Sequence, residues 1–581
     1  MNPDEYFLRP KTVAQKQYEV LRMFFIEGAP AKSVAKKFGY TYRTVTSLID
    51  DFRKNLSDKN VDDLFFAERH KGRKASVSNN EVKSIIVEMR KNFYSVENIK
   101  VLLDGKGYSI SEKSIFLILR REGFGRLPRR SKLIKNQLVE IKMAADKSEK
   151  LSFDPESFKS ASAGILCLIP YLNRYGLDKI IEQSDFPQTK TLDRVNSILS
   201  FLALKLSNIR RYSADNLWCM DRGSGLFAGL NVLPKTAWFT SYSDRVTSDM
   251  NLKFLRRLHQ TWVNEGLLSD TINLDFTTIP YWGDDAHLEN NWSGKRGKAL
   301  SSMLAILAND PDSGIIDYGN TNVLHKDESK VVLEFLDFYR YENYEHQHDL
   351  KYLVFDSKFT NYENLSKLDD KNTKFITIRR RGKNMVDKID RMPKNNWKTV
   401  RVECAGNKNR TLKVMDYTVF LKGYNKNIRQ ICITGHGKIK PAIILTNDFE
   451  LKLEKIIRKY SKRWLIEKGI SEQIEFFHLN RVSSSMVIKV DFDLTMSILA
   501  NNIYRLFALD LDRYAHSSVQ TLFEKFILNT ADINIEQEQI IINLKKKRNL
   551  PLVLETMCQF SNIKYRCFKN KKLIFQGASY S

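Results

Sequence analysis

The stretch TINLDFTTI (residues 271–279) decides how the middle of this 581-residue chain folds. Its apolar and β-branched residues predict a buried β-strand, yet Asp275 stands at its centre. A carboxylate at a buried strand position needs a hydrogen bond, a cation or a metal ion to offset its desolvation. The stretch therefore predicts both a central strand and a candidate functional site.

Further strands surround this stretch and carry a second acidic residue. ALSSMLAILA, SGIIDYGN and LKYLVFDSKF read as strands, and SKVVLEFLDFYRY reads as a helix before the last of them. Strands and helices mixed in this order predict an α/β core. Asp356 lies among apolar neighbours in LVFDSKF. Two such aspartates on neighbouring strands are harder to explain as structural residues than one.

A third carboxylate comes from YSKRWLIEKGISEQIEFFHL (residues 460–479), for which the sequence predicts an amphipathic helix. Tyr460, Arg463 and Glu467 follow the i, i+3, i+7 spacing that places side chains on one helix face. Hard divalent ions such as Mg²⁺ take several oxygen ligands, which Asp275, Asp356 and Glu467 could supply. Arg463 would then bind a phosphate or orient a carboxylate.

Alternatives to these carboxylates stay open at this point. Glu472 and Glu475 are rivals on the same predicted helix, and Glu475 lies nearer to the face of Glu467. Asp284 and Asp285 in YWGDDAHLEN would replace the first aspartate if the strand register differs. Glu467 itself could form a salt bridge with an arginine on a solvated helix face.

The charge of the chain indicates a polyanionic partner. The formal net charge is +26, and a surface this basic attracts nucleic acid more than small acidic metabolites. About half of the excess lies in residues 1–150, which hold 31 basic and 19 acidic residues. A lysine-rich host composition is the alternative explanation.

Residues 12–54 predict three short helices with the spacing of a helix-turn-helix. Ala35, Gly39, Val45 and Leu48 stand where that motif needs a small contact residue, a turn glycine and two core residues. The second helix of the motif would present polar side chains to base edges near its N-terminus, namely Thr41, Tyr42, Arg43, Thr44 and Ser47.

A second helical unit is predicted for residues 79–123, with Ser111 as the N-cap of its last helix. Lys113 and Ser114 would face a DNA groove, and Arg120 and Arg121 would lie near phosphates. The basic linker ERHKGRKASVS, which contains Arg73 and Lys74, could lie in a minor groove or act as a spacer. Two three-helix units joined in this way resemble the bipartite DNA-binding region of many transposases and of paired-type domains.

Three motifs together resemble the DDE transposases of bacterial insertion sequences, in the group with a Tyr-Arg-Glu-Lys signature. They are Asp275 in LDFTTIPYWG, Asp356 in VFDSKFTNYENL, and Tyr-x-x-Arg-x-x-x-Glu at residues 460–467. The resemblance implies a ribonuclease H-like catalytic core interrupted by a β-strand insertion. KFITIRRRG, TVRVECAG, TLKVMDYTVFLKG, IRQICITG and PAIILTND supply successive strands for that insertion.

One position departs from the signature. Its lysine falls on Ile474, so that the phosphate or DNA contact of this lysine must be absent or come from elsewhere. Lys468 and His478 are candidates by proximity only.

The resemblance also implies a reaction, a cofactor and partners. It implies a cut-and-paste transposase that cleaves transposon ends and transfers the strands into target DNA, with two Mg²⁺ ions and Mn²⁺ as a substitute. Double-stranded DNA is the expected partner, and a homodimer is expected in a synaptic complex. The basic residues expected along the DNA path are Lys295, Arg296, Lys298, Arg379, Arg380, Arg381 and Lys383. The rival functions are a DNA-binding regulator without catalysis and a metal-dependent nuclease lacking strand transfer.

The expected organisation is a multidomain α/β chain in the bacterial cytoplasm, associated with the nucleoid. The longest apolar run, at 162–173, is too short to cross a bilayer, and residues 1–10 lack a signal-peptide core. Six cysteines without a CxxC pair argue against disulfides and structural zinc. The expected parts are helix-turn-helix units at 1–58 and 76–135, a helical domain at 136–265, the catalytic core at 266–370 and 455–515, the insertion at 371–454, and a C-terminal region at 516–581.

Overall fold

The computed structural model describes most of the chain as two compact units, Met1–Asn80 and Glu81–Ser581. The described residues are 12–57, 80–91, 94–105, 108–125, 149–209, 217–280, 288–293, 297–341, 350–359, 361–404, 408–437, 440–479, 487–511 and 513–577. Six candidate residues lie outside them: Arg73, Lys74, Asp284, Asp285, Lys295 and Arg296.

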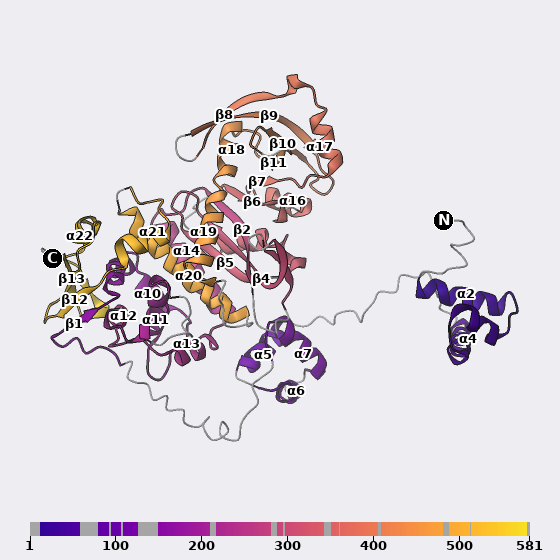
Figure 1. Ribbon diagram of the computed structural model, residues 1–581, viewed down its shortest axis with the longest axis horizontal. Coiled ribbons are helices and arrows are strands. Elements are labelled where there is room, and N and C mark those ends of the chain that lie inside the picture. Colours follow the sequence, from indigo (N-terminus) through magenta and orange to yellow (C-terminus); the bar gives the residue numbers. More distant parts are fainter. Residues whose placement is uncertain are drawn as a thin grey trace. The chain divides into compact units, whose positions relative to one another are not determined.

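The first unit contains the three helices predicted for residues 12–54. They are α2 (Val13–Phe25), α3 (Ala31–Phe38) and α4 (Tyr42–Ser57), drawn in indigo in Figure 1. Gly39 ends α3 with φ +64°, a conformation that glycine adopts without steric cost. Ala35 and Val45 are buried in the small core between the helices, and Leu48 is half-buried at its edge. The chain between α3 and α4 is therefore a tight turn closed by apolar contacts.

A second group of three helices follows in residues 80–121. The helices are α5 (Asn80–Lys91), α6 (Val96–Gly105) and α7 (Glu112–Arg121). The Ser111 side chain accepts a hydrogen bond from the Ser114 backbone N–H at 3.2 Å, which confirms the predicted N-cap. The helices enclose their own core of Val82, Ile86, Ile99, Leu103, Ile115, Leu119 and Phe124.

A ten-stranded sheet forms the centre of the second unit (Figure 1). Its first strands are β2 (Thr271–Pro280), β3 (Asn290–Ser293), β4 (Lys298–Asn309), β5 (Ile316–Val323), β6 (Tyr352–Phe355) and β7 (Lys374–Ile378). The order across the sheet is β5-β4-β2-β6-β7; β4 is antiparallel to β2 and β5, whereas β6 is parallel to β2 and β7. The helices α15 (Val331–Tyr339) and α16 (Tyr362–Asp370) precede β6 and β7 in sequence, as crossovers between parallel strands require.

The strands expected in the insertion continue this sheet and do not form a separate one. They are β8 (Lys398–Cys404), β9 (Lys408–Phe420), β10 (Asn427–Thr434) and β11 (Ala442–Thr446). β11 pairs with β7, which itself lies beside β6, so the expected boundary at 370/371 is no break in the sheet. The helix α17 (Lys383–Asp390), between β7 and β8, was not predicted.

The expected helical domain and the C-terminal region share a second sheet of five strands. β1 (Glu156–Ser160) pairs with β12 (Ala531–Ile535), and β13 (Gln539–Leu544), β15 (Lys571–Gly577) and β14 (Lys564–Tyr565) complete the order. The helix α22 (Leu550–Cys558) lies between β13 and β14 in sequence, with Pro551 in its first turn, where the missing N–H costs nothing.

The remaining helices pack around both sheets. They are α9 (Ile169–Arg174), α10 (Leu177–Gln183), α11 (Arg194–Leu206), α12 (Arg222–Phe227), α13 (Thr236–Ser243), α14 (Ser248–Asn264), α18 (Leu453–Ser461), α19 (Trp464–Glu475), α20 (Val487–Leu509) and α21 (Val519–Leu522). All but one of them pack on one continuous hydrophobic core, whereas α18 packs on a smaller core with strands of the ten-stranded sheet. Short helical turns complete the elements, namely η1 (Ala163–Leu168), η2 (Leu217–Met220), η3 (His325–Asp327), η4 (Ser357–Phe359), η5 (Lys394–Asn396), η7 (Phe523–Ile527) and η8 (Arg566–Phe568). In the part of the chain that the structure covers, no helix is long and apolar enough to span a bilayer.

Candidate active site

Asp275 lies in β2, and Asp356 directly follows β6, the strand that is parallel to β2. Leu274 of β2 pairs with Phe355 of β6, and each aspartate is the next residue along its strand direction. Because neighbouring strands lie about 4.8 Å apart, the register places both carboxylates at one point of the sheet. Each carboxylate accepts a hydrogen bond from the next backbone N–H, that of Phe276 at 2.8 Å and that of Ser357 at 2.6 Å.

The single helix predicted for residues 460–479 is wrong in one respect, because the chain turns between α18 and α19. α18 ends at Ser461, α19 begins at Trp464, and Arg463 occupies the N-cap position between them. Asn273 donates a hydrogen bond from its side-chain amide to the Lys462 carbonyl at 3.3 Å, and Asp275 contacts Arg463. Alternate residues of β2 therefore hold this turn against one face of the sheet.

Arg463 connects two of the three candidate carboxylates. One guanidinium nitrogen pairs with Asp275, and the other lies 2.9 Å from Oε1 of Glu467. The side chains of Arg463 and Asp275 are only 9% and 14% exposed, whereas that of Glu467 is 54% exposed. Since both carboxylates bind the same guanidinium, they are separated by little more than its width. The salt bridge between Glu467 and Arg463 is thus present. It is not confined to the solvated face of the helix, because the same Arg463 side chain also pairs with the buried Asp275.

The electrostatics of this group follow from its burial. Burial raises the pKa of Asp275 to about 6, although the nearby Arg463 guanidinium acts in the opposite direction. For Arg463 burial alone would lower the pKa, but the carboxylates of Asp275, Asp356 and Glu467 outweigh it and the pKa is raised. Burial also raises the pKa of Tyr460 to about 12, so its hydroxyl stays protonated at neutral pH.

The donor set suits a divalent cation, but the described residues hold a different cation at this point. The charges of three carboxylates act on the buried Arg463 guanidinium. Hard cations such as Mg²⁺ prefer carboxylate oxygens as ligands. Within the described ranges, no group of three His, Cys, Asp or Glu side chains is arranged to hold a metal ion. The Arg463 guanidinium supplies the positive charge instead.

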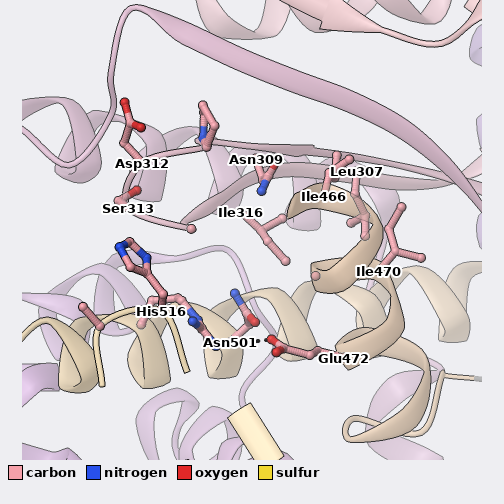
Figure 2. A pocket seen from close by; sticks show the side chains of 15 residues that line it. Leu307, Asn309, Asp312, Ser313, Ile316, Ile466, Ile470, Glu472, Asn501 and His516 are labelled. Atoms are coloured by element: carbon pink, nitrogen blue, oxygen red, sulfur yellow. Dashed lines mark hydrogen bonds and ion pairs between the residues drawn. The ribbon is translucent and has the colours of Figure 1, made fainter. Parts of the chain in front are cut away.

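The rival carboxylates on α19 lie elsewhere. Glu472 pairs with Arg505 at 3.3 Å and lines a cavity of about 70 Å³ between α19, α20 and the ends of β4 and β5 (Figure 2). Glu475 is exposed on the last turn of α19. Ile474, at the position of the signature lysine, is half-buried, and Nε2 of His478 lies 2.6 Å from the Asn208 side-chain oxygen. Because the His478 side chain contacts Asn208, it is not placed to replace the lysine of the signature.

A stacked aromatic pair adjoins the carboxylates and was not predicted from the sequence. The rings of Phe276 and Phe359 lie 4.0 Å apart with an interplanar angle of 8°. Arg380 donates a hydrogen bond from Nε to the Ser357 carbonyl at 3.2 Å, which places a cation beside the second aspartate. The sequence feature that could have predicted this pair is a phenylalanine shortly after each aspartate: Phe276 in DF and Phe359 in DSKF.

The candidate DNA-binding residues of the helical units lie on exposed helix faces. Thr41, Tyr42, Arg43, Thr44 and Ser47 are exposed at the start of α4, and Lys113, Ser114, Arg120 and Arg121 are exposed on α7. The Thr41 hydroxyl also accepts a hydrogen bond from the Thr44 N–H at 3.1 Å. Thr41 therefore caps its helix while the other side chains remain accessible.

The candidate cations of the sheet have different environments. Arg379 donates to the Gln430 side-chain oxygen at 2.5 Å, and Arg381 donates to the Pro441 carbonyl, so both bind protein acceptors. Lys298 and Lys383 are exposed.

Comparisons with known proteins relate part of this chain to a protein family. Residues 269–503 match the family model described as a transposase DDE domain. This range spans β2, β6 and α19, and thus all three candidate carboxylates. This match supports a DNA transposase as the function of the chain, that is, an enzyme that cleaves DNA and transfers the cut strand.

A structural comparison finds the piggyBac transposase synaptic complex with hairpin DNA, at a TM-score of 0.34 and 10% sequence identity. That similarity covers 64% of this chain and 82% of the other. No curated protein matches the chain by sequence.

Proposed function

We propose that Asp275, Asp356 and Glu467 are the catalytic carboxylates of this transposase. The observation that carries the proposal is the convergence of all three on the buried position of Arg463, from two adjacent parallel strands and one helix. The strand order β5-β4-β2-β6-β7, with three parallel central strands, supports a ribonuclease H-like core. The tyrosine and arginine at 460 and 463 support the Tyr-Arg-Glu-Lys group of bacterial insertion sequences.

The same carboxylates would hold two Mg²⁺ ions, with Mn²⁺ as a substitute. Bound there, such ions supply a hydroxide nucleophile at neutral pH and Lewis-acid stabilisation of the charge on the phosphate. The raised pKa of Asp275 supports this role. Burial makes the ionised carboxylate unfavourable, and a bound cation would offset that free-energy cost.

The residues around the carboxylates bind and orient the DNA. Arg463 exchanges its carboxylate contacts for the scissile phosphate, to which a guanidinium donates paired hydrogen bonds. Tyr460 keeps its proton and donates a hydrogen bond near the same point. Arg380 holds the loop after Asp356 through the Ser357 carbonyl. Water or a free 3′-hydroxyl attacks the phosphate in line with the leaving oxygen.

The remaining parts bring DNA to this site. The exposed polar and basic residues of α4 and α7 support two helix-turn-helix units for the transposon ends, the first at 1–58 and the second at 76–135. Two protomers would join the two ends in a synaptic complex, in the cytoplasm of a bacterium and on its nucleoid DNA. Lys298 and Lys383 would contact phosphates along the sheet.

The test separates catalysis from binding. Asp275→Asn, Asp356→Asn and Glu467→Gln should each lower Mg²⁺-dependent cleavage of a plasmid carrying the element by at least about a hundredfold, since each removes a charged oxygen ligand that would hold the metal ions. Binding of the same DNA in EDTA should stay within about twofold, because phosphate contacts dominate affinity. Glu475→Gln serves as the matched control on α19.

The same assay distinguishes the two rival functions. A variant at 275, 356 or 467 that cuts at the wild-type rate contradicts the assignment. A wild-type protein that cleaves the ends but never joins them to target DNA is a nuclease without strand transfer. A protein that binds the ends without cutting them is a regulator.

A further inference from the structure

We infer that the basic face of α18 forms a groove for the phosphate backbone of duplex DNA next to the catalytic carboxylates. The inference rests on the proposed function, because it assigns a further contact to the same DNA. The groove has a volume of about 240 Å³ and is lined by Thr271, Pro311, Asp312, Lys455, Arg458, Lys459 and Lys462.

The four cations of the groove come from one helix face. Positions 455, 458, 459 and 462 follow the i, i+3, i+4, i+7 spacing, which places their side chains in one row. The opposite face of α18 is apolar: Ile456 and Ile457 are buried against strands of the sheet. The helix is therefore fixed with its basic row outward.

Contacts to the protein hold part of this row in place. Nζ of Lys459 lies 3.0 Å from the Asp270 carboxylate and 4.4 Å from the centre of the Tyr352 ring, and its side chain is only 24% exposed. Lys462 pairs with Asp312. The lining of the groove thus holds four cations and one carboxylate, that of Asp312. Lys455 and Arg458 are exposed. The groove keeps a net positive charge, which suits a polyanion.

The position of the groove connects it to the reaction. Thr271 and Asp275 point to the same face of β2, because they are four residues apart on one strand. This separation is about 13 Å at the rise of a β-strand, or about four base pairs of duplex at 3.4 Å each. A duplex that follows β2 from a scissile phosphate at Asp275 would pass over the groove. The occupant is therefore duplex DNA about four base pairs from the cut.

The test measures binding without cleavage, on the full chain in EDTA with a random-sequence duplex. The variant Lys455→Gln/Arg458→Gln is compared with Lys546→Gln/Lys564→Gln, which removes two exposed lysines near the C-terminal sheet. The slope of log K against log salt concentration should fall by about 0.9 for each phosphate that the groove variant no longer binds. The control should keep its slope.

Two further measurements complete the test. Asp312→Asn should act in the opposite direction, with tighter binding, because Lys462 loses its acidic partner. The DNA should also protect Lys455 of the wild-type chain from an amine-reactive reagent. An unchanged slope together with unprotected Lys455 would overturn the inference, whether or not the protein cleaves DNA. A wild-type chain that never cleaves DNA but shows the slope change would instead refute the proposed catalysis and leave the groove in place.

Discussion

At the scale of single residues, the site is organised around one buried cation. Arg463 lies between Asp275 and Glu467, and the charge of Asp356 also acts on it. Burying these charges is expensive, and their mutual attraction offsets part of the cost. Replacing the arginine or one of the carboxylates should therefore change the stability of the metal-free protein.

Asp275→Asn should remove a loss of stability that the metal-free protein undergoes as the pH rises. The carboxyl group has a pKa of about 6 in the folded chain against an ordinary value of 3.8, so the unfolded chain releases the proton first as pH rises. Stability is therefore lost between about pH 4 and pH 6, and the variant escapes a loss of at most about 3 kcal/mol. Denaturant unfolding in EDTA at several pH values measures this difference.

Two comparisons make that measurement decisive. The difference in stability between the variant and wild type should stay constant below about pH 4, where the carboxyl group is protonated in both states. Asp337→Asn, at a side chain that is 68% exposed, should show no such pH dependence. A variant at 275 whose stability changes with pH between about pH 4 and pH 6 in the same way as wild type would contradict the raised pKa of Asp275.

Arg463→Gln should make folding depend on divalent ions. The change leaves the carboxylates without their cation, which costs about 3 to 5 kcal/mol for a buried pair. Millimolar Mg²⁺ should then raise the melting temperature of the variant more than that of wild type. Arg391→Gln, at an exposed position, is the matched control. Equal Mg²⁺-induced shifts in all three proteins would show that the arginine does not occupy a cation position.

At the scale of elements, close packing of α20 on β5 fixes the central sheet. A Cβ added to Gly319 of β5 would lie 2.6 Å from Ile498 Cδ1 and 3.1 Å from Leu307 and Leu494. These residues belong to the continuous core that also supports β2 and β6. The register of the two aspartates therefore depends on contacts made on other strands and helices.

Gly319→Ala should lower the free energy of unfolding by about 1 to 3 kcal/mol, because the added methyl group displaces core side chains. Gly469→Ala in α19 is the matched control, since a Cβ there meets no atom within 4 Å. That change should stabilise the helix by about 0.5 to 1 kcal/mol. Urea unfolding of both variants gives the comparison, and equal effects of the two changes would contradict the packing argument.

At the scale of the whole molecule, the positive charge is divided between separately folded parts. Residues 1–80 form their own unit, whose small core is made by its own three helices. They hold 15 basic and 10 acidic residues, and the rest of the excess charge lies in the second unit. Binding of DNA is thus expected to be shared between units, while cleavage belongs to the second.

Deletion of residues 1–80 should weaken DNA binding without unfolding the remainder. The melting temperature of the second unit should be unchanged, since its cores use no residue before Val82. The affinity for transposon-end DNA should fall at least about tenfold, and the salt dependence should become less steep because the shortened chain binds fewer phosphates. Fluorescence anisotropy with labelled duplex measures both quantities. An unchanged affinity would assign end binding to the second unit alone.

The sequence by itself determined the local features of this protein. Alternating and continuous apolar runs specified β2, β4, β5 and β6, because side chains alternate across a strand and buried strands are apolar on both faces. The cost of burying a carboxylate made Asp275 and Asp356 candidates. The spacing that made Arg463 and Glu467 candidates assumed one helix, where the structure has α18 and α19 with a turn between them. Turn and capping chemistry specified the helices around Gly39 and Ser111.

Only the tertiary structure decided how these features meet. The turn at Lys462 and Arg463 depends on contacts with Asn273 and Asp275, which lie almost two hundred residues earlier in the chain. The pairing of β1 with β12 and of β7 with β11 likewise joins strands that are distant in sequence. Periodicity reports which face of an element is buried, but not which partner covers it. Long-range strand pairing and the burial of Arg463 among the carboxylates therefore emerge only when the chain is folded.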